Sequence, residues 1–326
     1  MTAQFGRYLA LSGGVGGAKL ALGLSRSLGA DELTVLVNTG DDFEHFGLRI
    51  CPDLDSLTYA LSGLSNQTVG WGQKDETWQC LDALGRLGGE DWFRLGDRDL
   101  ATHILRSEWL RAGQSLTEVT AKLCAALEIK TEVLPMSNDS VATEIICQSG
   151  ESLSFQHYFV RERCEPPIQD VRFKGIDQAA LNPKAAALLD GPSPLDGVII
   201  CPSNPFVSVR PILDLDQMAR RLIEHKAPVI AVSPIVSGLA IKGPAAKMME
   251  EMQLPQSALG VAEYYVQHYP QVFDGFVLDI QDEHSASDIE RLGLKVLVTN
   301  TMMHSLEDRC QLAENVLSFC REIARK

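Results

Sequence analysis

The stretch Y-L-A-L-S-G-G-V-G-G-A-K-L-A-L-G-L-S-R-S-L (8–28), followed by L-T-V-L-V (33–37), determines the fold class of this chain. Its first four residues are apolar and predict a buried strand. A glycine-rich turn follows at 12–19, and residues 19–28 predict a helix that leads to a second strand at 33–37. A strand–helix–strand unit of this kind pairs its strands in parallel, with a right-handed crossover. We therefore expect an α/β fold.

Similar short apolar runs recur in the second half of the chain and alternate with helical stretches. They are V-I-I-C (198–201), V-I-A-V (229–232), F-V-L (276–278) and V-L-V (296–298), and a final helix is predicted over 305–326. Runs of this length between helices are typical of a parallel sheet that is covered on both faces. The prediction is a Rossmann-like, doubly wound, mainly parallel α/β sheet.

The middle of the chain has a different pattern. Residues 56–127 are mostly helical in character and carry all four tryptophans, whereas 131–175 predict short strands, including S-L-S-F-Q-H-Y-F-V at 152–160. We therefore predict a Rossmann-like core made of 1–55 and 191–326, which holds the nucleotide and metal site. Residues 56–190 would form an inserted, mostly helical and mixed subdomain.

Composition excludes several classes of protein. A net charge of −14, from 29 basic and 43 acidic residues, disfavours nucleic-acid binding, which needs a basic surface. Nothing approaches eighteen consecutive apolar residues, so no membrane span is expected. Eight cysteines without a C-x-x-C pair argue against a zinc site and a disulfide framework. Together with an N-terminus that lacks a signal peptide's apolar core, these features predict a cytoplasmic protein.

The glycine-rich turn is a candidate phosphate site. After a strand, glycine allows the backbone to approach a phosphate closely, and the following helix N-terminus offers free N–H groups and the positive end of its dipole. The candidate nucleotide-binding residues here are Gly13, Gly14, Gly16, Gly17 and Lys19. The turn fits neither G-x-G-x-x-G with a clean ribose acid nor the P-loop motif, so a tight turn without a ligand is the alternative.

An acidic region follows the second predicted strand. N-T-G-D-D (38–42) and C-P-D-L-D (51–55) place four carboxylates within fifteen residues: Asp41, Asp42, Asp53 and Asp55. Magnesium takes one or two protein carboxylates together with substrate phosphates and water, so two of the four would suffice. Any single aspartate here is explained equally well as a helix or turn cap, but all four together are not.

Two further segments carry polar groups. R-L-G-D-R-D-L-A-T-H (94–103) contains Arg94 and Arg98, which could hold a phosphate or carboxylate by forked hydrogen bonds, although an exposed salt-bridged helix start is the alternative. His103 is a weaker candidate for acid–base chemistry. Ser203 and Asn204 follow a predicted strand, where open sheets bind ligands, although plain turn chemistry also explains this segment.

These motifs, taken in order, resemble those of the 2-phospho-L-lactate transferases of deazaflavin coenzyme F420 biosynthesis (the CofD/FbiA type). The matching segments span nearly the whole chain and are S-G-G-V-G-G-A-K-L (12–20), V-N-T-G-D-D (37–42), G-L-R-I-C-P-D-L-D-S (47–56), G-W-G-Q-K-D-E-T-W (70–78), L-G-D-R-D-L-A-T-H-I-L-R-S (95–107), L-P-M-S-N-D (134–139), P-S-N-P (202–205), S-P-I-V-S-G (233–238) and G-V-A-E-Y-Y (260–265).

The resemblance implies a Mg²⁺-dependent transfer from a guanosine diphosphate-activated donor. The donor carries 2-phospho-L-lactate, phosphoenolpyruvate or 3-phosphoglycerate, and no motif identifies which of these acids is used. The acceptor is Fo (7,8-didemethyl-8-hydroxy-5-deazariboflavin), and the inserted subdomain would contribute to its binding site. The products are F420-0 or dehydro-F420-0 and GMP. A homodimer is also implied.

The resemblance also assigns roles to residues. By this resemblance Asp55 and Arg94 would contact Fo. It does not settle which carboxylates share the ion, and Asp41 with Asp55 is our choice of metal ligands. From the chemistry of phosphoryl transfer we expect Asp55 or Asp42 to accept the proton of the attacking hydroxyl and Arg98 to stabilise the phosphoryl oxygens. The glycine-rich turn with Ser203 and Asn204 would hold the guanosine diphosphate part of the donor.

Two other functions are compatible with parts of the sequence. A non-catalytic, nucleotide-sugar-binding regulatory protein of the YvcK type shares the glycine turn and an acidic segment, but lacks the C-P-D-L-D and L-G-D-R-D segments. An NAD-dependent oxidoreductase needs an acidic residue at the end of the second strand. Here Asn38 and Thr39 occupy that place.

Overall fold

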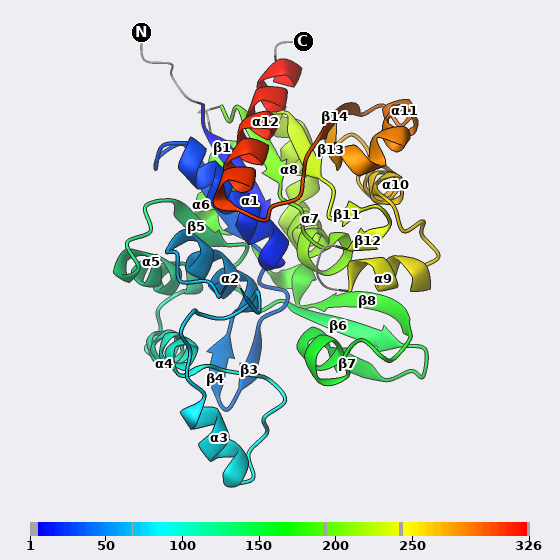
Figure 1. Ribbon diagram of the computed structural model, residues 1–326. Coiled ribbons are helices and arrows are strands. Elements are labelled where there is room, and N and C mark those ends of the chain that lie inside the picture. Colours follow the sequence, from blue (N-terminus) through cyan, green and yellow to red (C-terminus); the bar gives the residue numbers. More distant parts are fainter. Residues whose placement is uncertain (1–5, 67, 192–193, 241–243, 325–326) are drawn as a thin grey trace.

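A computed structural model describes residues 6–66, 68–191, 194–240 and 244–324 (Figure 1). Its centre is a seven-stranded sheet in which every neighbouring pair is parallel. The strand order is β14 (Lys295–Thr299), β13 (Gly275–Asp279), β10 (Val229–Val232), β9 (Gly197–Ile200), β1 (Tyr8–Ser12), β2 (Leu33–Val37) and β5 (Glu132–Pro135). The predicted doubly wound α/β fold is confirmed.

The order of the strands reverses between β1 and β9, because the chain runs outward from β1 through β2 to β5 and then returns to β9 on the other side. In open α/β sheets, ligands bind outside the carboxyl ends of the strands at such a switch point. We therefore expect a ligand at the segments that follow β1 and β9, which begin at Gly13 and Cys201.

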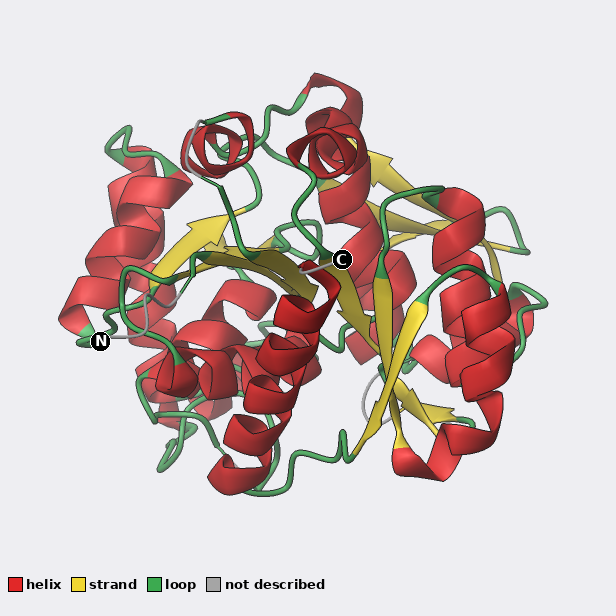
Figure 2. Ribbon diagram, turned by 90° about the horizontal axis from the view of Figure 1, so that it is seen from above, coloured by secondary structure: helices red, strands yellow, loops and turns green. Residues whose placement is uncertain are grey.

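Helices cover both faces of the sheet (Figure 2). On one face, α1 (Gly14–Ser27), α2 (Pro52–Leu61) and α12 (Leu306–Ala324) share a core with Tyr8 and Ala10 of β1. On the other, α7 (Arg210–Asp214), α8 (Met218–His225) and α10 (Ala258–His268) share a second core with Leu9 and Leu11. This alternation along β1 is what two-sided burial of a strand requires.

The remaining elements surround this core. They are the hairpin β3 (Phe43–His45) and β4 (Leu48–Ile50), the antiparallel sheet of β7 (Ser152–Ser154), β6 (Ala142–Cys147) and β8 (Ile168–Lys174), the pair β11 (Ile235–Val236) and β12 (Leu239–Ala240), and the helices α3 (Gln79–Arg86), α4 (Asp97–Arg111), α5 (Leu116–Ala126), α6 (Pro183–Asp190), α9 (Ala245–Glu251) and α11 (Ala286–Arg291). Both the β3–β4 hairpin and the β6–β8 sheet lie at the carboxyl-end side of the main sheet (Figure 1). No helix in the described ranges is long and apolar enough to cross a membrane.

Two local predictions were wrong. Helix α1 begins at Gly14 rather than at Lys19, because Gly16 lets the helix start press against the segment after β9: a Cβ there would lie 2.4 Å from the carbonyl oxygen of Pro202. In the predicted strand 152–160, only Ser152–Ser154 is extended, and His157–Arg161 is a π-helical turn. Phe155 and Phe159 stack at helical spacing, with ring centroids 5.5 Å apart.

The predicted division into a core and the insertion 56–190 stays a prediction. The structure places β5, which belongs to 56–190, in the main sheet beside β2. It places the β6–β8 sheet next to the acidic loop, where the backbone N–H of Thr143 donates to the carbonyl of Gly40 at 2.7 Å. The middle of the chain therefore supplies both a strand of the core and a wall of the candidate site.

Packing between α1 and α12 gives a test of the fold. A Cβ at Gly23 would lie 2.1 Å from the carbonyl oxygen of Arg309, and backbone cannot move aside easily. We expect Gly23→Ala to lower the free energy of unfolding by about 1–3 kcal/mol, although alanine is the better helix former by about 1 kcal/mol. Urea unfolding measures the change.

Gly85→Ala in α3 is the matched control, because nothing lies within 4 Å of a Cβ at Gly85. This variant should be as stable as the wild type or more stable, by up to about 1 kcal/mol. Equal stabilisation by both substitutions would show that α1 and α12 do not approach as closely as described.

Candidate functional site at the switch point

The two loops at the switch point contact each other directly. The backbone N–H of Gly13, after β1, donates to the Oγ of Ser203, after β9, at 3.1 Å. A Cβ at Gly17 would lie 2.7 Å from the same Oγ, so glycine is needed for this approach. The structure therefore brings the glycine-rich turn and Ser203 together, although they are 190 residues apart in the chain.

The other two predicted nucleotide-binding side chains make contacts within the protein. Asn204 accepts from the backbone N–H of Phe206 at 2.9 Å and caps the short helical turn that follows β9. The Nζ of Lys19 donates to the carbonyl oxygen of Met303 at 3.1 Å, in the segment between β14 and α12. Lys19 is thus turned toward that segment.

Asn38, the residue directly after β2, connects three segments of the site. Its Nδ2 donates to Asp53 at 2.9 Å and to the carbonyl of Val207 at 3.2 Å, while its Oδ1 accepts the N–H of Gly40 at 2.8 Å. The side chain is completely buried. Asp53, held in this way, faces the glycine turn, because a Cβ at Gly13 would lie 3.0 Å from its Oδ2.

All four predicted aspartates are buried at this end of the sheet, each 5–6% exposed. Burial raises the pKa of Asp41 well above its usual value, and repulsion from Asp53 and Asp42 raises it further. Burial also raises the pKa of Asp42 to about 7, opposed by the Arg49 guanidinium, and that of Asp53 to about 6. A cluster of buried carboxylates with raised pKa values is an environment that favours a bound cation.

The donor set at Asp41 and Asp42 fits magnesium. Asp42 is paired only loosely with Arg49, at 3.4 Å, and its Oδ1 is buried without a hydrogen-bond partner in the described chain. Thr143, at the start of β6, donates to Asp41 over 3.4 Å. Carboxylate oxygens with spare coordination capacity are the ligands that a hard cation prefers.

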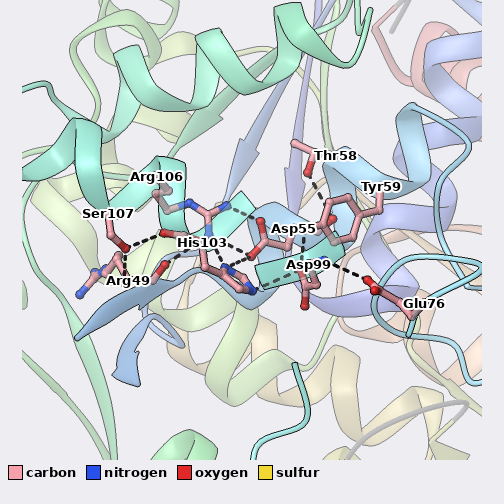
Figure 3. A network of polar contacts seen from close by, with 9 residues as sticks. All are labelled: Arg49, Asp55, Thr58, Tyr59, Glu76, Asp99, His103, Arg106 and Ser107. Atoms are coloured by element: carbon pink, nitrogen blue, oxygen red, sulfur yellow. Dashed lines mark hydrogen bonds and ion pairs between the residues drawn. The ribbon is translucent and has the colours of Figure 1, made fainter. Parts of the chain in front are cut away.

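Asp55 belongs to a network with α4 (Figure 3). Both of its oxygens accept from Arg106, by Nη1 to Oδ2 at 3.1 Å and by Nη2 to Oδ1. His103 lies beside this pair, with its Nδ1 3.7 Å from Asp55 and its Nε2 3.2 Å from Asp99. The hydroxyl of Tyr59 donates to Asp99 Oδ1, the oxygen nearest to His103, at 2.5 Å.

A residue of segment 70–78 caps α4, and a residue of segment 94–107 caps α3. The Glu76 carboxylate accepts the backbone N–H groups of Arg98 and Asp99, at 2.8 and 2.9 Å, and so caps α4. Asp97, in turn, accepts two backbone N–H groups at the start of α3. Gly96 permits this arrangement, because a Cβ there would lie 2.2 Å from the Glu76 carboxyl carbon. The caps fix where the buried face of α4 lies.

The predicted substrate-binding arginines lie on the exposed side of these segments. The Arg94 guanidinium stacks over the Trp78 ring, 4.6 Å from its centroid. The Nη1 of Arg98 donates to the carbonyl of Lys74 at 3.1 Å. Neither arginine has a described contact with Asp55, so the structure brings together the four aspartates but not these two arginines.

Sequence reasoning gave no role to Asp99, Arg106, Arg49 or Asn38, and only a weak acid–base role to His103. Asp99, His103 and Arg106 follow the spacing i, i+4, i+7, which places them on one face of α4, and that periodicity could have identified the set. Arg49 and Asn38 had no comparable signal. Arg49, on β4, lies 3.4 Å from Asp42, and the buried Asn38 acts through hydrogen bonds to Asp53 and Val207.

A doubly wound parallel sheet with a glycine turn and an acidic cluster at its switch point defines a class of α/β proteins that bind phosphorylated ligands there. The family model described as "2-phospho-L-lactate transferase CofD" matches residues 9–307. The chain therefore belongs to this family, as the motifs predicted.

Individual relatives agree with this assignment. A 2-phospho-L-lactate transferase of Methanosarcina acetivorans is 40% identical over 309 residues, covering 95% of this chain and 97% of that protein. A phosphoenolpyruvate transferase of Kitasatospora aureofaciens is 35% identical over 322 residues, covering 97% and 98%. The crystal structure of a UPF0052 family protein from Bacillus halodurans matches the fold with a TM-score of 0.65 at 13% identity, covering 96% of this chain and 99% of that chain.

The buried carboxylates predict how stability depends on pH. An unfolded aspartate titrates near about 3.9, whereas the folded pKa values of Asp53 and Asp42 are about 6 and about 7. Between these limits the folded chain binds more protons, so metal-free stability should fall as pH rises from about 4 to about 7. The slope per group is at most about 1.4 kcal/mol per pH unit.

Urea unfolding in the presence of a chelator measures this slope. Asp42→Asn should flatten it and should make the metal-free protein more stable than the wild type above about pH 7, because a neutral amide removes the buried charge. An Asp42→Asn protein with the wild-type slope would contradict the account of the cluster.

Proposed function

We propose that the protein is a transferase of coenzyme F420 biosynthesis. It moves a phospho-three-carbon-acid group from a guanosine diphosphate-activated donor to the terminal ribityl hydroxyl of Fo and releases GMP. The observation that carries the proposal is the match to named transferases along nearly the entire chain, with the acidic and glycine segments converging at one switch point.

The nucleotide part of the donor binds at the glycine-rich turn. The N-terminus of α1 presents backbone N–H groups and the positive end of its dipole to the diphosphate. Gly13, Gly14, Gly16 and Gly17 allow close approach, and Ser203 and Asn204 contribute from the β9 loop. The direct contact between Gly13 and Ser203 supports a shared role. Lys19 completes the set by leaving the Met303 carbonyl for a phosphate oxygen.

Asp41 and Asp55 hold Mg²⁺, with Asp42 close by. The ion, when bound, neutralises charge on the diphosphate oxygens during transfer. The unpartnered Oδ1 of Asp42 and the repulsion among the aspartates support a cation at this place. Because Arg106 occupies both oxygens of Asp55, this carboxylate has less spare capacity than Asp41.

The acceptor hydroxyl attacks the phosphorus that carries the three-carbon acid, and the bond from that phosphorus to the oxygen of GMP breaks. Asp42 is the better proton acceptor of the two candidates, because its Oδ1 has no hydrogen-bond donor in the described chain, whereas Arg106 occupies both oxygens of Asp55. Asp55 contacts Fo and fixes its orientation. Arg98 stabilises the phosphoryl oxygens and Arg94 binds Fo, which requires their exposed segment to turn inward.

The regulatory alternative of the YvcK type is disfavoured, because the relatives that match over the full chain bear transferase names. Those names include both phospholactate and phosphoenolpyruvate transferases, so the acid is a matter for experiment. We further propose a cytoplasmic homodimer that binds neither nucleic acid nor membrane.

Incubating the protein with Fo, Mg²⁺ and each of the three activated donors should release GMP from at least one of them. Chromatography of GMP and of the deazaflavin product, compared side by side, identifies the acid. A protein that binds guanosine diphosphate but releases no GMP from any donor would favour the regulatory alternative.

Substitution separates the carboxylates. Asp41→Asn should lower kcat by at least about 100-fold and raise the Mg²⁺ concentration needed for half-maximal rate, because a charged metal ligand is lost. Asp55→Asn should lower kcat to a similar extent. Asp170→Asn, at a half-exposed side chain on β8, is the control and should have no effect. Near-wild-type turnover in both site variants would rule out the metal site.

A further inference from the structure

The buried face of α4 carries a set of polar side chains that the proposed mechanism does not use directly. Asp99, His103 and Arg106 are 8%, 1% and 2% exposed and follow one another toward Asp55. Groups buried this deeply must satisfy one another, because water cannot reach them. The pattern of donors and acceptors therefore determines where the protons are.

Arg106 decides the state of the His103 ring. A guanidinium offers only donors, and its Nη1 lies 3.1 Å from the Nδ1 of His103, so Nδ1 accepts and carries no proton. The Nε2 then carries the proton and lies 3.2 Å from Asp99, without the geometry of a hydrogen bond. A proton on Nδ1 would instead point at the guanidinium, and its nearest carboxylate oxygen, on Asp55, is 3.7 Å away.

Two further contacts fix the position of Asp99. Tyr59 donates to the same carboxylate oxygen that faces His103, and Glu76 accepts the backbone N–H of Asp99. The chain of contacts thus runs from the capped start of α4 through Asp99 and His103 to Arg106 (Figure 3). Arg106 contacts the Nδ1 of His103 and donates to both oxygens of Asp55.

We propose that His103 is a positioning residue of the transfer reaction. The neutral His103 ring, protonated on Nε2, holds Arg106 in register, and Arg106 presents Asp55 to the acceptor. This inference rests on the proposed function for its kinetic consequence, whereas the state of the ring is independent of it. A misplacement of about 1 Å at a reacting group can cost about 100-fold in rate.

A metal site is the competing interpretation of the same residues. Asp55, Asp99 and His103 offer ligand atoms that all lie within 4.8 Å of one another. However, the permanently charged Arg106 guanidinium lies against both His103 and Asp55, and a divalent cation among them would meet that charge at close range. The geometry therefore disfavours a metal ion held by Asp99 and His103, and Arg106 is the cation in contact with His103.

Two substitutions distinguish the ring's nitrogens. In His103→Asn the amide oxygen can replace Nδ1 as acceptor for Arg106, whereas in His103→Gln the amide reaches the place of Nε2 and leaves Arg106 unsupported. We expect His103→Asn to keep kcat within about threefold of the wild type, and His103→Gln to lose about 10–100-fold in kcat with KM within about twofold. His284→Gln, on the exposed turn Ile280–Ser285, is the control and should match the wild type.

If His103 had a purely structural role, the activity of each variant would follow its melting temperature, whichever ring nitrogen the new side chain replaces. Equal losses of kcat in His103→Asn and His103→Gln would therefore overturn the proposal. Mn²⁺ titration calorimetry adds a second readout. His103→Asn should bind Mn²⁺ like the wild type, and a lost site would show instead that His103 is a metal ligand.

Long-range ¹⁵N–¹H NMR of the histidine rings tests the tautomer directly. The His103 signals, assigned by their absence in His103→Asn, should show a neutral ring protonated on Nε2 at neutral pH. A proton on Nδ1 would overturn the inference. This result does not depend on turnover, so failure of all three donors would contradict the proposed function while leaving the NMR result decisive for His103.

Discussion

The structure depends on the burial of four aspartates at the carboxyl end of one parallel sheet. Removing a carboxylate from water is costly unless donors or cations replace the water, and here the replacements come from distant parts of the chain. Asn38 donates a hydrogen bond to Asp53, Arg49 pairs with Asp42, and Arg106 donates to Asp55. The β3–β4 hairpin and α4 are thereby tied to the end of β2. The repulsion that remains at Asp41 is what a bound cation would relieve.

Helix α4 follows a loop of little regular structure, and a helix cap from Glu76 fixes its position relative to that loop. The capping of α4 by Glu76 and of α3 by Asp97 joins the two segments. Through this pair of caps the position of α4, and with it Arg106, is set by residues on the protein surface.

Much of this fold is predictable from the sequence, because buried parallel strands appear as short apolar runs. The strands at 33–37 and 229–232 have the predicted bounds. The errors have physical causes: the start of α1 is decided by the contact of Gly16 with Pro202, and 152–160 mixes alternating and helical spacing. The gathering of the aspartates followed from their place after β2. Arg49 and Asn38 could not be predicted, since their partners are brought to them only by tertiary packing.

The central claim is that these carboxylates and the glycine turn hold one metal–diphosphate group between them. Electron–nuclear double resonance of Mn²⁺ bound to the protein with GDP tests it most directly. The account predicts ³¹P coupling from GDP in the wild type and loss of that coupling in Asp41→Asn. Mn²⁺ that binds the wild-type protein and GDP without ³¹P coupling, or coupling that is unchanged in Asp41→Asn, would contradict it.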